Sequence, residues 1–178
     1  MSKRVLIISS SPRKGGNSDL LCDEFKRGAE DSGNIVEKIF LRDKKTAPCL
    51  ACDACKKNGG KCVQQDDMAE MLQKMHEANV IVMATPVYFY SLSAQLKIFI
   101  DRIYAQYTDI SGKDMYFIVT AAAGKAALDR TIECWRGLVD CLPGSKEKGI
   151  VYGNGLWNKG EAAGSRAMQE AYEMGRQV

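Results

Sequence analysis

Short apolar segments alternate with amphipathic segments along the chain, and this alternation constrains the fold more than any other feature. Residues 4–9 (RVLIIS), 79–84 (NVIVMA) and 114–120 (DMYFIVT) are short, rich in residues that favour strands, and bounded by Gly, Pro, Ser or Asn. Such segments predict buried strands. Residues 34–40 (NIVEKIF) and 149–152 (GIVY) are weaker candidates for two further strands.

The segments between these strands carry apolar residues at helical spacing. A fourth helix is expected over about 128–142 and a fifth over about 165–177. The alternation predicts an α/β fold with a doubly wound, five-stranded parallel sheet that has helices on both faces. The stripes that indicate the first three helices are Leu21, Phe25 and Ala29; Met68, Met71, Leu72 and Met75; and Leu92, Leu96, Phe99 and Ile103.

Length and composition favour a single domain over residues 1–178, because 178 residues with 46% hydrophobic content can bury a sizeable core. The amino-terminal apolar run is too short for a signal peptide, and no apolar run reaches the roughly 20 residues that span a bilayer. We therefore expect a cytoplasmic protein without structural disulfides and without a membrane partner. The 25 basic and 22 acidic residues give a net charge of +3, with no dense basic run. This distribution argues against a nucleic-acid partner.

The first predicted strand leads directly into residues 10–18 (SSPRKGGNS) and then into a helix. Hydroxyl groups, a guanidinium and unencumbered backbone amides at a helix amino end are the groups that bind a phosphate monoester. We expect Asn17 or Ser18 to cap that helix. The alternative to a phosphate-binding loop is an ordinary polar junction between a strand and a helix, with Arg13 exposed to solvent. The motifs GxGxxG and GxxxxGK[ST] do not occur in the sequence, and residues 153–160 (GNGLWNKG) are interpreted only as a glycine-rich loop.

Two further loops follow predicted strands. Residues 85–97 (TPVYFYSLSAQLK) place three aromatic side chains where a buried strand reaches the surface, and such side chains suit a flat ligand. Residues 119–126 (VTAAAGKA) carry small side chains, which either let a planar ring lie against the backbone or form a plain flexible turn. In open α/β sheets ligands bind beyond the carboxyl ends of the strands, where the winding reverses. For the strand order 2-1-3-4-5, the loops after strands one and three meet at that point.

Four cysteines lie close together at Cys49, Cys52, Cys55 and Cys62, in the pattern C-x2-C-x2-C-x6-C within a segment (44–65) that lacks helix and strand periodicity. This compact spacing favours a 4Fe–4S site. Reactive or vestigial thiols are the first alternative, and an all-cysteine zinc site is the second, because zinc ligands usually come as two separated pairs. The other cysteines are Cys22, Cys134 and Cys141, to which no chemistry is assigned, and the single histidine, His76, is interpreted as a helix-surface residue.

Residues 10–18, 85–102 (TPVYFYSLSAQLKIFIDR) and 151–162 (VYGNGLWNKGEA) resemble the flavodoxin-like NAD(P)H-dependent FMN reductases, particularly their iron-sulfur flavoprotein branch. The resemblance covers nearly the whole chain. It implies a flavodoxin-like sheet of order 2-1-3-4-5 and bound FMN. Tyr90 departs from the small residue expected there, and its ring is expected to shield the flavin or to narrow access for nicotinamide. The residues implied to hold the FMN phosphate are Ser11, Arg13, Asn17 and Ser18; those implied to border the isoalloxazine are Pro86, Val87, Tyr88, Phe89 and Tyr90; and those implied to close over its other edge are Thr120, Ala121, Ala122, Ala123 and Gly124.

The function that the resemblance implies is an FMN-dependent oxidoreductase. It would accept electrons from NADH or NADPH and pass them to a small-molecule or protein acceptor, with the 4Fe–4S cluster as an additional carrier. The flavin supplies the chemistry, so no catalytic acid or base is predicted. Two alternatives are a flavodoxin-type electron carrier without nicotinamide turnover and a cysteine-metal regulatory module. The resemblance also implies a homodimer or higher homo-oligomer.

Overall fold

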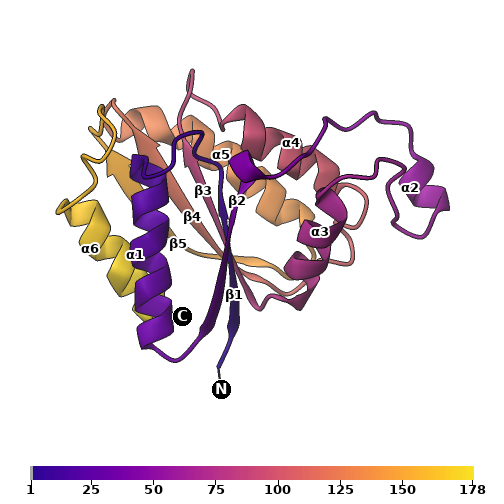
Figure 1. The fold of residues 1–178 in the computed structure, drawn as a ribbon, viewed down its shortest axis with the longest axis horizontal. Helices are drawn as coiled ribbons and strands as arrows, with labels where there is room; N and C mark the ends of the chain where they lie inside the picture. Colours follow the sequence, from indigo (N-terminus) through magenta and orange to yellow (C-terminus); the bar gives the residue numbers. More distant parts are fainter. Residues whose placement is uncertain (1) are drawn as a thin grey trace.

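A computed structural model describes residues 2–178 and contains one five-stranded parallel sheet (Figure 1). The strand order β2-β1-β3-β4-β5 confirms the expected flavodoxin-like topology, including both weaker strand candidates. The last strand is longer than the sequence pattern indicated. The strands are β1 (Arg4–Ser9), β2 (Ile35–Phe40), β3 (Val80–Pro86), β4 (Asp114–Ala121) and β5 (Lys146–Asn154).

Helices cover both faces of this sheet (Figure 1). Helices α1 (Asn17–Asp31) and α6 (Arg166–Arg176) pack on one face, and α3 (Met68–Glu77), α4 (Ala94–Ile103) and α5 (Ala126–Cys141) pack on the other. Two short helices, η1 (Leu41–Asp43) and α2 (Ala54–Lys57), lie between β2 and α3. In Figure 1 the segment that carries α2 projects away from the sheet beyond α3 and α4.

The central strands alternate their side chains between two apolar layers. In β1, Val5 and Ile7 join the layer under α1 and α6, whereas Leu6 and Ile8 join the layer under α3, α4 and α5. All four side chains are buried. Apolar residues on both faces explain why these strands read as continuous apolar runs in the sequence.

Helices α1 and α6 approach so closely that glycine is required at their crossing. A Cβ atom on Gly28 would lie 2.1 Å from the carbonyl oxygen of Tyr172, and one on Gly175 would lie 2.1 Å from that of Phe25. The close crossing fixes α6 against α1, and the loop that precedes α6 is thereby brought to the amino end of α1.

The apolar stripes predict the helices correctly, with one exception. Leu92 is buried as expected but lies before α4, because Ser93 is the N-cap residue of that helix and accepts a hydrogen bond from the Leu96 N–H. None of the helices within residues 2–178 is long and apolar enough to cross a membrane.

Candidate functional site

The three loops singled out in the sequence meet at one cavity beyond the carboxyl ends of β1, β3 and β4. Its volume is about 420 Å³, which lies within the usual range for small-molecule sites. The cavity also receives two residues from the loop after β5. Its lining residues are Ser11, Arg13, Gly16, Asn17, Ser18, Pro86, Val87, Tyr88, Thr120, Ala121, Ala122, Leu156 and Trp157.

The loop after β1 forms a tight cradle at the amino end of α1. The Ser11 hydroxyl donates to the Arg13 carbonyl (2.9 Å) and accepts from the Arg13 N–H (3.2 Å), while the Gly16 N–H donates to the same carbonyl (3.0 Å). A Cβ atom on Gly16 would lie 2.6 Å from the Ser11 hydroxyl oxygen, so only glycine fits there. The first N–H groups of a 15-residue helix then face the cavity without intrahelical partners, which suits an anion.

The expected cap of α1 by Asn17 or Ser18 is wrong, because Gly16 occupies the N-cap position and both residues lie inside the helix. The Asn17 amide has a different role. Its nitrogen donates to the carbonyl of Asn158 (2.9 Å) and, at 3.4 Å, to that of Leu156, and its oxygen accepts from the N–H groups of Gly160 (3.1 Å) and Ala162 (3.1 Å). Both polar atoms of the Asn17 side chain thus bond the loop after β5. Only the backbone N–H of Asn17 remains to bind a ligand.

The loop at 153–160, interpreted in the sequence only as glycine-rich, is therefore a fourth wall of the cavity. Leu156 and Trp157 line it, and the Trp157 side chain is 76% exposed at its mouth. The local pattern could not reveal this wall, because Asn17 holds the loop from about 140 residues away in the sequence.

A buried carboxylate braces the cradle from behind. Asp19 is 5% exposed and accepts from the Gly15 N–H (2.8 Å) and the Ser9 hydroxyl (3.3 Å), and it forms an ion pair with Lys38 of β2. Burial by itself lowers the pKa of Lys38, but its contacts with Cys22, Asp19 and Asp23 raise the pKa overall. The lysine therefore stays charged and balances a negative charge close to a cradle suited to phosphate.

The loop after β3 displays its aromatic side chains through a strained turn. Phe89 (φ 49°) and Tyr90 (φ 60°) are non-glycine residues in the left-handed region, and the backbone groups of Tyr88 and Ser91 bond to each other across them (3.1 and 3.0 Å). Phe89 is fully exposed and Tyr90 largely so. Strain of this kind is held by surrounding structure and is typical of ligand-contacting loops.

The third loop is joined to the second through the Val87 N–H, which donates to the Thr120 carbonyl (2.7 Å). Thr120, Ala121 and Ala122 line the cavity. Four of the residues that the family resemblance implied, Phe89, Tyr90, Ala123 and Gly124, flank this lining in the chain and are not part of it.

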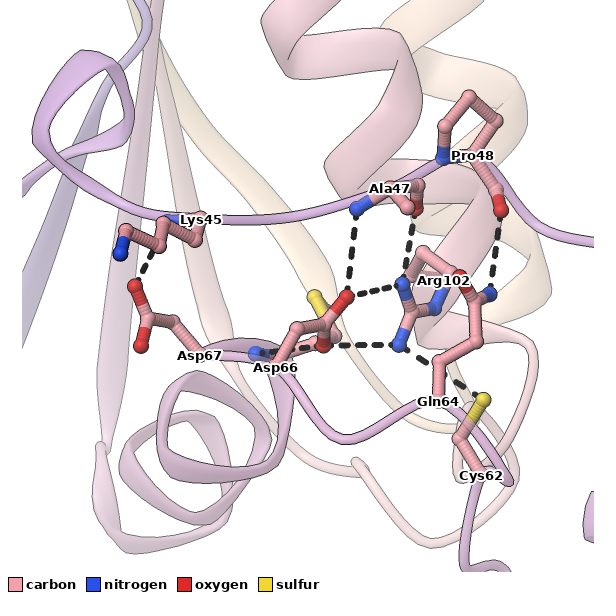
Figure 2. Close-up of polar contacts among 9 residues, drawn as sticks. Lys45, Ala47, Pro48, Cys62, Gln64, Asp66, Asp67 and Arg102 are labelled. Carbon is pink, nitrogen blue, oxygen red and sulfur yellow. Dashed lines mark hydrogen bonds and ion pairs between the residues drawn. The ribbon is translucent and has the colours of Figure 1, made fainter.

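The cysteine segment is anchored at the carboxyl end of α4, whereas the amino end of this helix lies near the cavity (Figure 2). Arg102, in the last turn of α4, donates to the Ala47 carbonyl (2.8 Å), to both carboxylate oxygens of Asp66 (2.6 and 2.9 Å) and to the Cys62 sulfur (3.6 Å). Burial by itself raises the pKa of Asp66, but hydrogen bonds from Arg102 and from two backbone N–H groups lower it overall. The pair is therefore ionised at neutral pH.

Residues just beyond α4 hold the middle of the same segment. The Gln106 amide donates to the Gly60 carbonyl (3.1 Å) and also bonds the ring of His76 (2.8 Å), which is half-buried on α3. The Tyr104 hydroxyl donates to Asp53 (3.1 Å), and its ring lies under the Lys56 ammonium (4.1 Å). Residues 102–106 thus contact the cysteine segment at both of its ends and in its middle.

The four cysteines themselves are open to solvent or only partly covered. Cys49 and Cys52 are exposed, whereas Cys55 and Cys62 are half-buried. Among residues 2–178, no three Cys, His, Asp or Glu side chains are grouped closely enough to hold a metal ion. Cys49 lines a cavity of about 770 Å³ that Cys134 and Cys141 of α5 also line, so these two cysteines are not remote from the segment as the sequence suggested.

The chemistry of the segment nevertheless fits a metal–thiolate centre. Four thiolates are the donor set of iron–sulfur clusters and of all-cysteine zinc sites. Two of the sulfurs accept N–H donors, Cys49 from the Ala51 backbone (3.4 Å) and Cys62 from Arg102 (3.6 Å). Donors of this kind stabilise thiolate ligands. Binding a metal would require the exposed part of the segment to draw the sulfurs together.

Comparison with known proteins agrees with this geometry. An iron-sulfur flavoprotein of Methanocaldococcus jannaschii is 46% identical over 99 residues, which cover 56% of this chain and 51% of that protein. An iron-sulfur flavoprotein of Archaeoglobus fulgidus is 35% identical over 136 residues, which cover 72% of this chain and 61% of that protein. The chain thus spans about half to three fifths of the length of these relatives.

Solved structures share the fold. An azoreductase from Bacillus anthracis superposes with a TM-score of 0.78 at 17% identity and covers 100% of both chains. An NAD(P)H:quinone oxidoreductase from Methanothermobacter marburgensis superposes with a TM-score of 0.75 at 16% identity, covering 99% of this chain and 97% of that one. The sequence model of one family, described as NADPH-dependent FMN reductase, matches residues 3–143. The chain therefore belongs to the NADPH-dependent FMN reductase family.

Proposed function

We propose that the protein is an FMN-dependent oxidoreductase that takes electrons from NADH or NADPH and passes them to a small-molecule or protein acceptor. The observation that carries this proposal is the convergence of the loops after β1, β3 and β4 on one cavity at the switch point of the sheet. Bound flavin supplies hydride and electron transfer, and the protein binds and orients it.

Each wall of the cavity has a part in this proposal. Ser11, Arg13 and Ser18, with the backbone N–H groups at the start of α1, would hold the FMN phosphate. Residues 86–90 would border the flavin ring, and residues 120–124 would close over its other edge. The cradle supports FMN in preference to FAD, because it fits a phosphate monoester at a helix amino end.

Two cations follow the loop after β4 in the sequence and support an anionic nucleotide as the electron donor. The Arg130 guanidinium lies 5.4 Å from the centre of the Tyr90 ring, and the Lys125 ammonium lies 4.3 Å from that of Tyr152. Both residues belong to the start of α5 or directly precede it. The pyrophosphate of NADH or NADPH is the anion expected there.

We also propose that Cys49, Cys52, Cys55 and Cys62 ligate a 4Fe–4S cluster. The donor set supports this, as do the iron-sulfur flavoprotein relatives. Free thiols and a zinc site are the alternatives. The seven cysteines are all unpaired with one another within the described residues, which suits a reducing compartment, so a cytoplasmic location belongs to the same proposal.

A second copy of the chain is the proposed cover for the exposed aromatic side chains at the mouth. Phe89, Tyr90 and Trp157 expose large apolar surfaces beside the cavity. Exposed aromatic groups of this size mark interaction sites. Light scattering that gives a monomer mass with FMN bound would contradict the homodimer without affecting the flavin proposal.

The experiment that tests the function starts from protein purified without oxygen. Released flavin is identified by chromatography, and oxidation of NADH and NADPH is followed with and without a quinone as acceptor. Bound FMN with nicotinamide turnover is the expected result. Bound FMN without turnover would favour the flavodoxin-type carrier, and absence of flavin affinity would favour a cysteine-metal regulatory module.

A further inference from the structure

Arg102 is the most deeply buried charged side chain that the proposed flavin site does not use. It is 2% exposed and reaches from the last turn of α4 to both ends of the cysteine segment. On one side it bonds the Ala47 carbonyl, and on the other it bonds Asp66 through both carboxylate oxygens (Figure 2). One guanidinium therefore fixes the points where the segment leaves and rejoins the body of the protein.

Anchoring alone does not account for this arrangement. A buried ion pair contributes little net stability, because desolvation offsets most of the Coulomb attraction. In the described part of the chain, the Arg102 Nε–H has no hydrogen-bond partner, and Nη2 is directed at the Cys62 sulfur at 3.6 Å. A neutral thiol is a weak acceptor, whereas a metal-bound thiolate is a strong one.

The four cysteines also differ in how firmly they are held. Cys62 is half-buried and bonded to Arg102, whereas Cys49 and Cys52 are exposed on the projecting part of the segment. With both ends of the segment fixed, closing its middle part onto Cys62 loses less conformational entropy than closing a free loop. The anchored cysteine is thus the natural first ligand.

We propose that Arg102 is the positioning residue of the metal site: it holds Cys62 as the pre-placed ligand, onto which Cys49, Cys52 and Cys55 close when the cluster is bound. This inference rests on the proposed 4Fe–4S site and adds the residue that organises it. Arg102 acts through Cys62 and touches no substrate. If the cluster is bound, the hydrogen bond from Arg102 to the Cys62 sulfur would raise its reduction potential, as N–H donors to cluster sulfurs do.

The test compares Arg102→Gln and Arg102→Lys with the wild type and with Arg136→Gln. Arg136 is a matched control, because it lies on the exposed side of α5 and pairs with Glu133 and Glu147. Iron and sulfide are reconstituted without oxygen, and the release of iron to a chelator is then timed. We expect iron release from Arg102→Gln to be about 10 to 100 times faster than from the wild type, the usual effect of losing an outer partner of a ligand. Arg102→Lys should be intermediate, and the control unchanged.

The reduction potential of the cluster distinguishes a residue that positions a ligand from one that only anchors the segment. Loss of the N–H donor to sulfur should shift the potential of the remaining cluster to lower values in Arg102→Gln, whereas a loosened segment would expose the cluster to water and shift its potential to higher values. If Arg102→Gln does not fold, Asp66→Asn serves instead, because it weakens the hold on Arg102 while keeping an acceptor; faster iron release is expected. Wild-type iron release and potential in these variants would overturn the inference while leaving the cluster proposal standing. A wild-type protein that takes up no iron would contradict both.

Discussion

The hydroxyl oxygen of Ser93 lies 2.9 Å from that of Ser10, which joins the start of α4 to the end of β1 inside the protein. The Ser93 backbone N–H donates to the Thr85 hydroxyl oxygen (3.0 Å), and the Ser93 hydroxyl caps α4. The first and second loops of the cavity are therefore connected through buried protein groups.

Ser93→Ala should lower the free energy of unfolding by about 1 to 2 kcal/mol, because a helix cap and a buried hydrogen bond are lost together. It should also weaken FMN binding, since Ser10 leads into the phosphate cradle. Ser165→Ala is the control: it removes the cap of α6, where the hydroxyl accepts from the Met168 N–H. That variant should lose about 1 kcal/mol of stability and keep its FMN affinity. Equal FMN affinities in all three proteins would show that the two loops act independently.

Arg13→Ala should weaken FMN binding about 10- to 150-fold, the scale of one charge-assisted hydrogen bond to phosphate. The fold should be intact, because the Arg13 side chain is exposed and takes part in none of the described ion pairs. Fluorescence titration of the apoprotein measures the affinity. Arg27→Ala, on the outer surface of α1, should leave it unchanged, and an unchanged affinity in Arg13→Ala would remove this residue from the phosphate site.

Gly16→Ala should destroy the cradle, because its Cβ would meet the Ser11 hydroxyl at 2.6 Å and the Arg13 carbonyl at 3.0 Å. A loss of about 1 to 3 kcal/mol in stability and a large loss of FMN affinity are expected from this overpacking. Gly137→Ala, in the interior of α5 where nothing lies within 4 Å, should instead stabilise the protein by about 0.5 to 1 kcal/mol. Thermal unfolding and flavin titration of both variants make the comparison, and normal FMN binding by Gly16→Ala would refute the cradle geometry.

Asn17→Ala should release the loop at 156–162 from α1. Two backbone N–H groups, of Gly160 and Ala162, lose their acceptor, so a loss of about 2 to 3 kcal/mol is expected. Hydrogen exchange at these two amides reports the release directly. Asn158→Ala, an exposed residue of the same loop, should change stability by less than about 1 kcal/mol. Protection of both amides in Asn17→Ala would mean that other contacts hold the loop.

Cys22 should resist alkylation at pH 8 while Cys49 and Cys52 react, because burial raises the pKa of the Cys22 thiol to about 12. Mass spectrometry of the metal-free protein after timed exposure to iodoacetamide distinguishes the sites, and guanidinium-unfolded protein is the control in which all seven react. A Cys22 that reacts as fast as Cys49 in the folded protein would contradict the burial.

The same shift predicts a pH dependence of stability. The thiol stays protonated in the folded state beyond its ordinary value of 9.0, so its contribution is complete below pH 9.0 and is lost as the pH rises toward 12. Cys22→Ala should reduce the fall in stability over this range, as measured by urea unfolding.

Periodicity and spacing in the sequence were enough to predict the five strands and the five helices that cover the sheet, whereas the strand order, and so the place where the three loops meet, was implied by the family resemblance. A strand that is buried on both faces appears in the sequence as an apolar run, and a helix with one buried face appears as apolar residues at helical spacing. The carboxyl ends of parallel strands must lie at the same edge of the sheet. These signals are local, so each can be recognised within ten to twenty residues.

Tertiary structure alone decided what certain polar side chains do. Asn17 was expected to cap a helix, but its amide bonds a loop about 140 residues later in the sequence. Arg102, to which the sequence assigned no role, is buried between Ala47, Cys62 and Asp66. Cys134 and Cys141 reach the cavity of Cys49 only because α5 packs beside α4. A buried hydrogen-bonding group takes whichever partner the folded chain brings to it, and no periodic pattern records a partner so distant in the sequence.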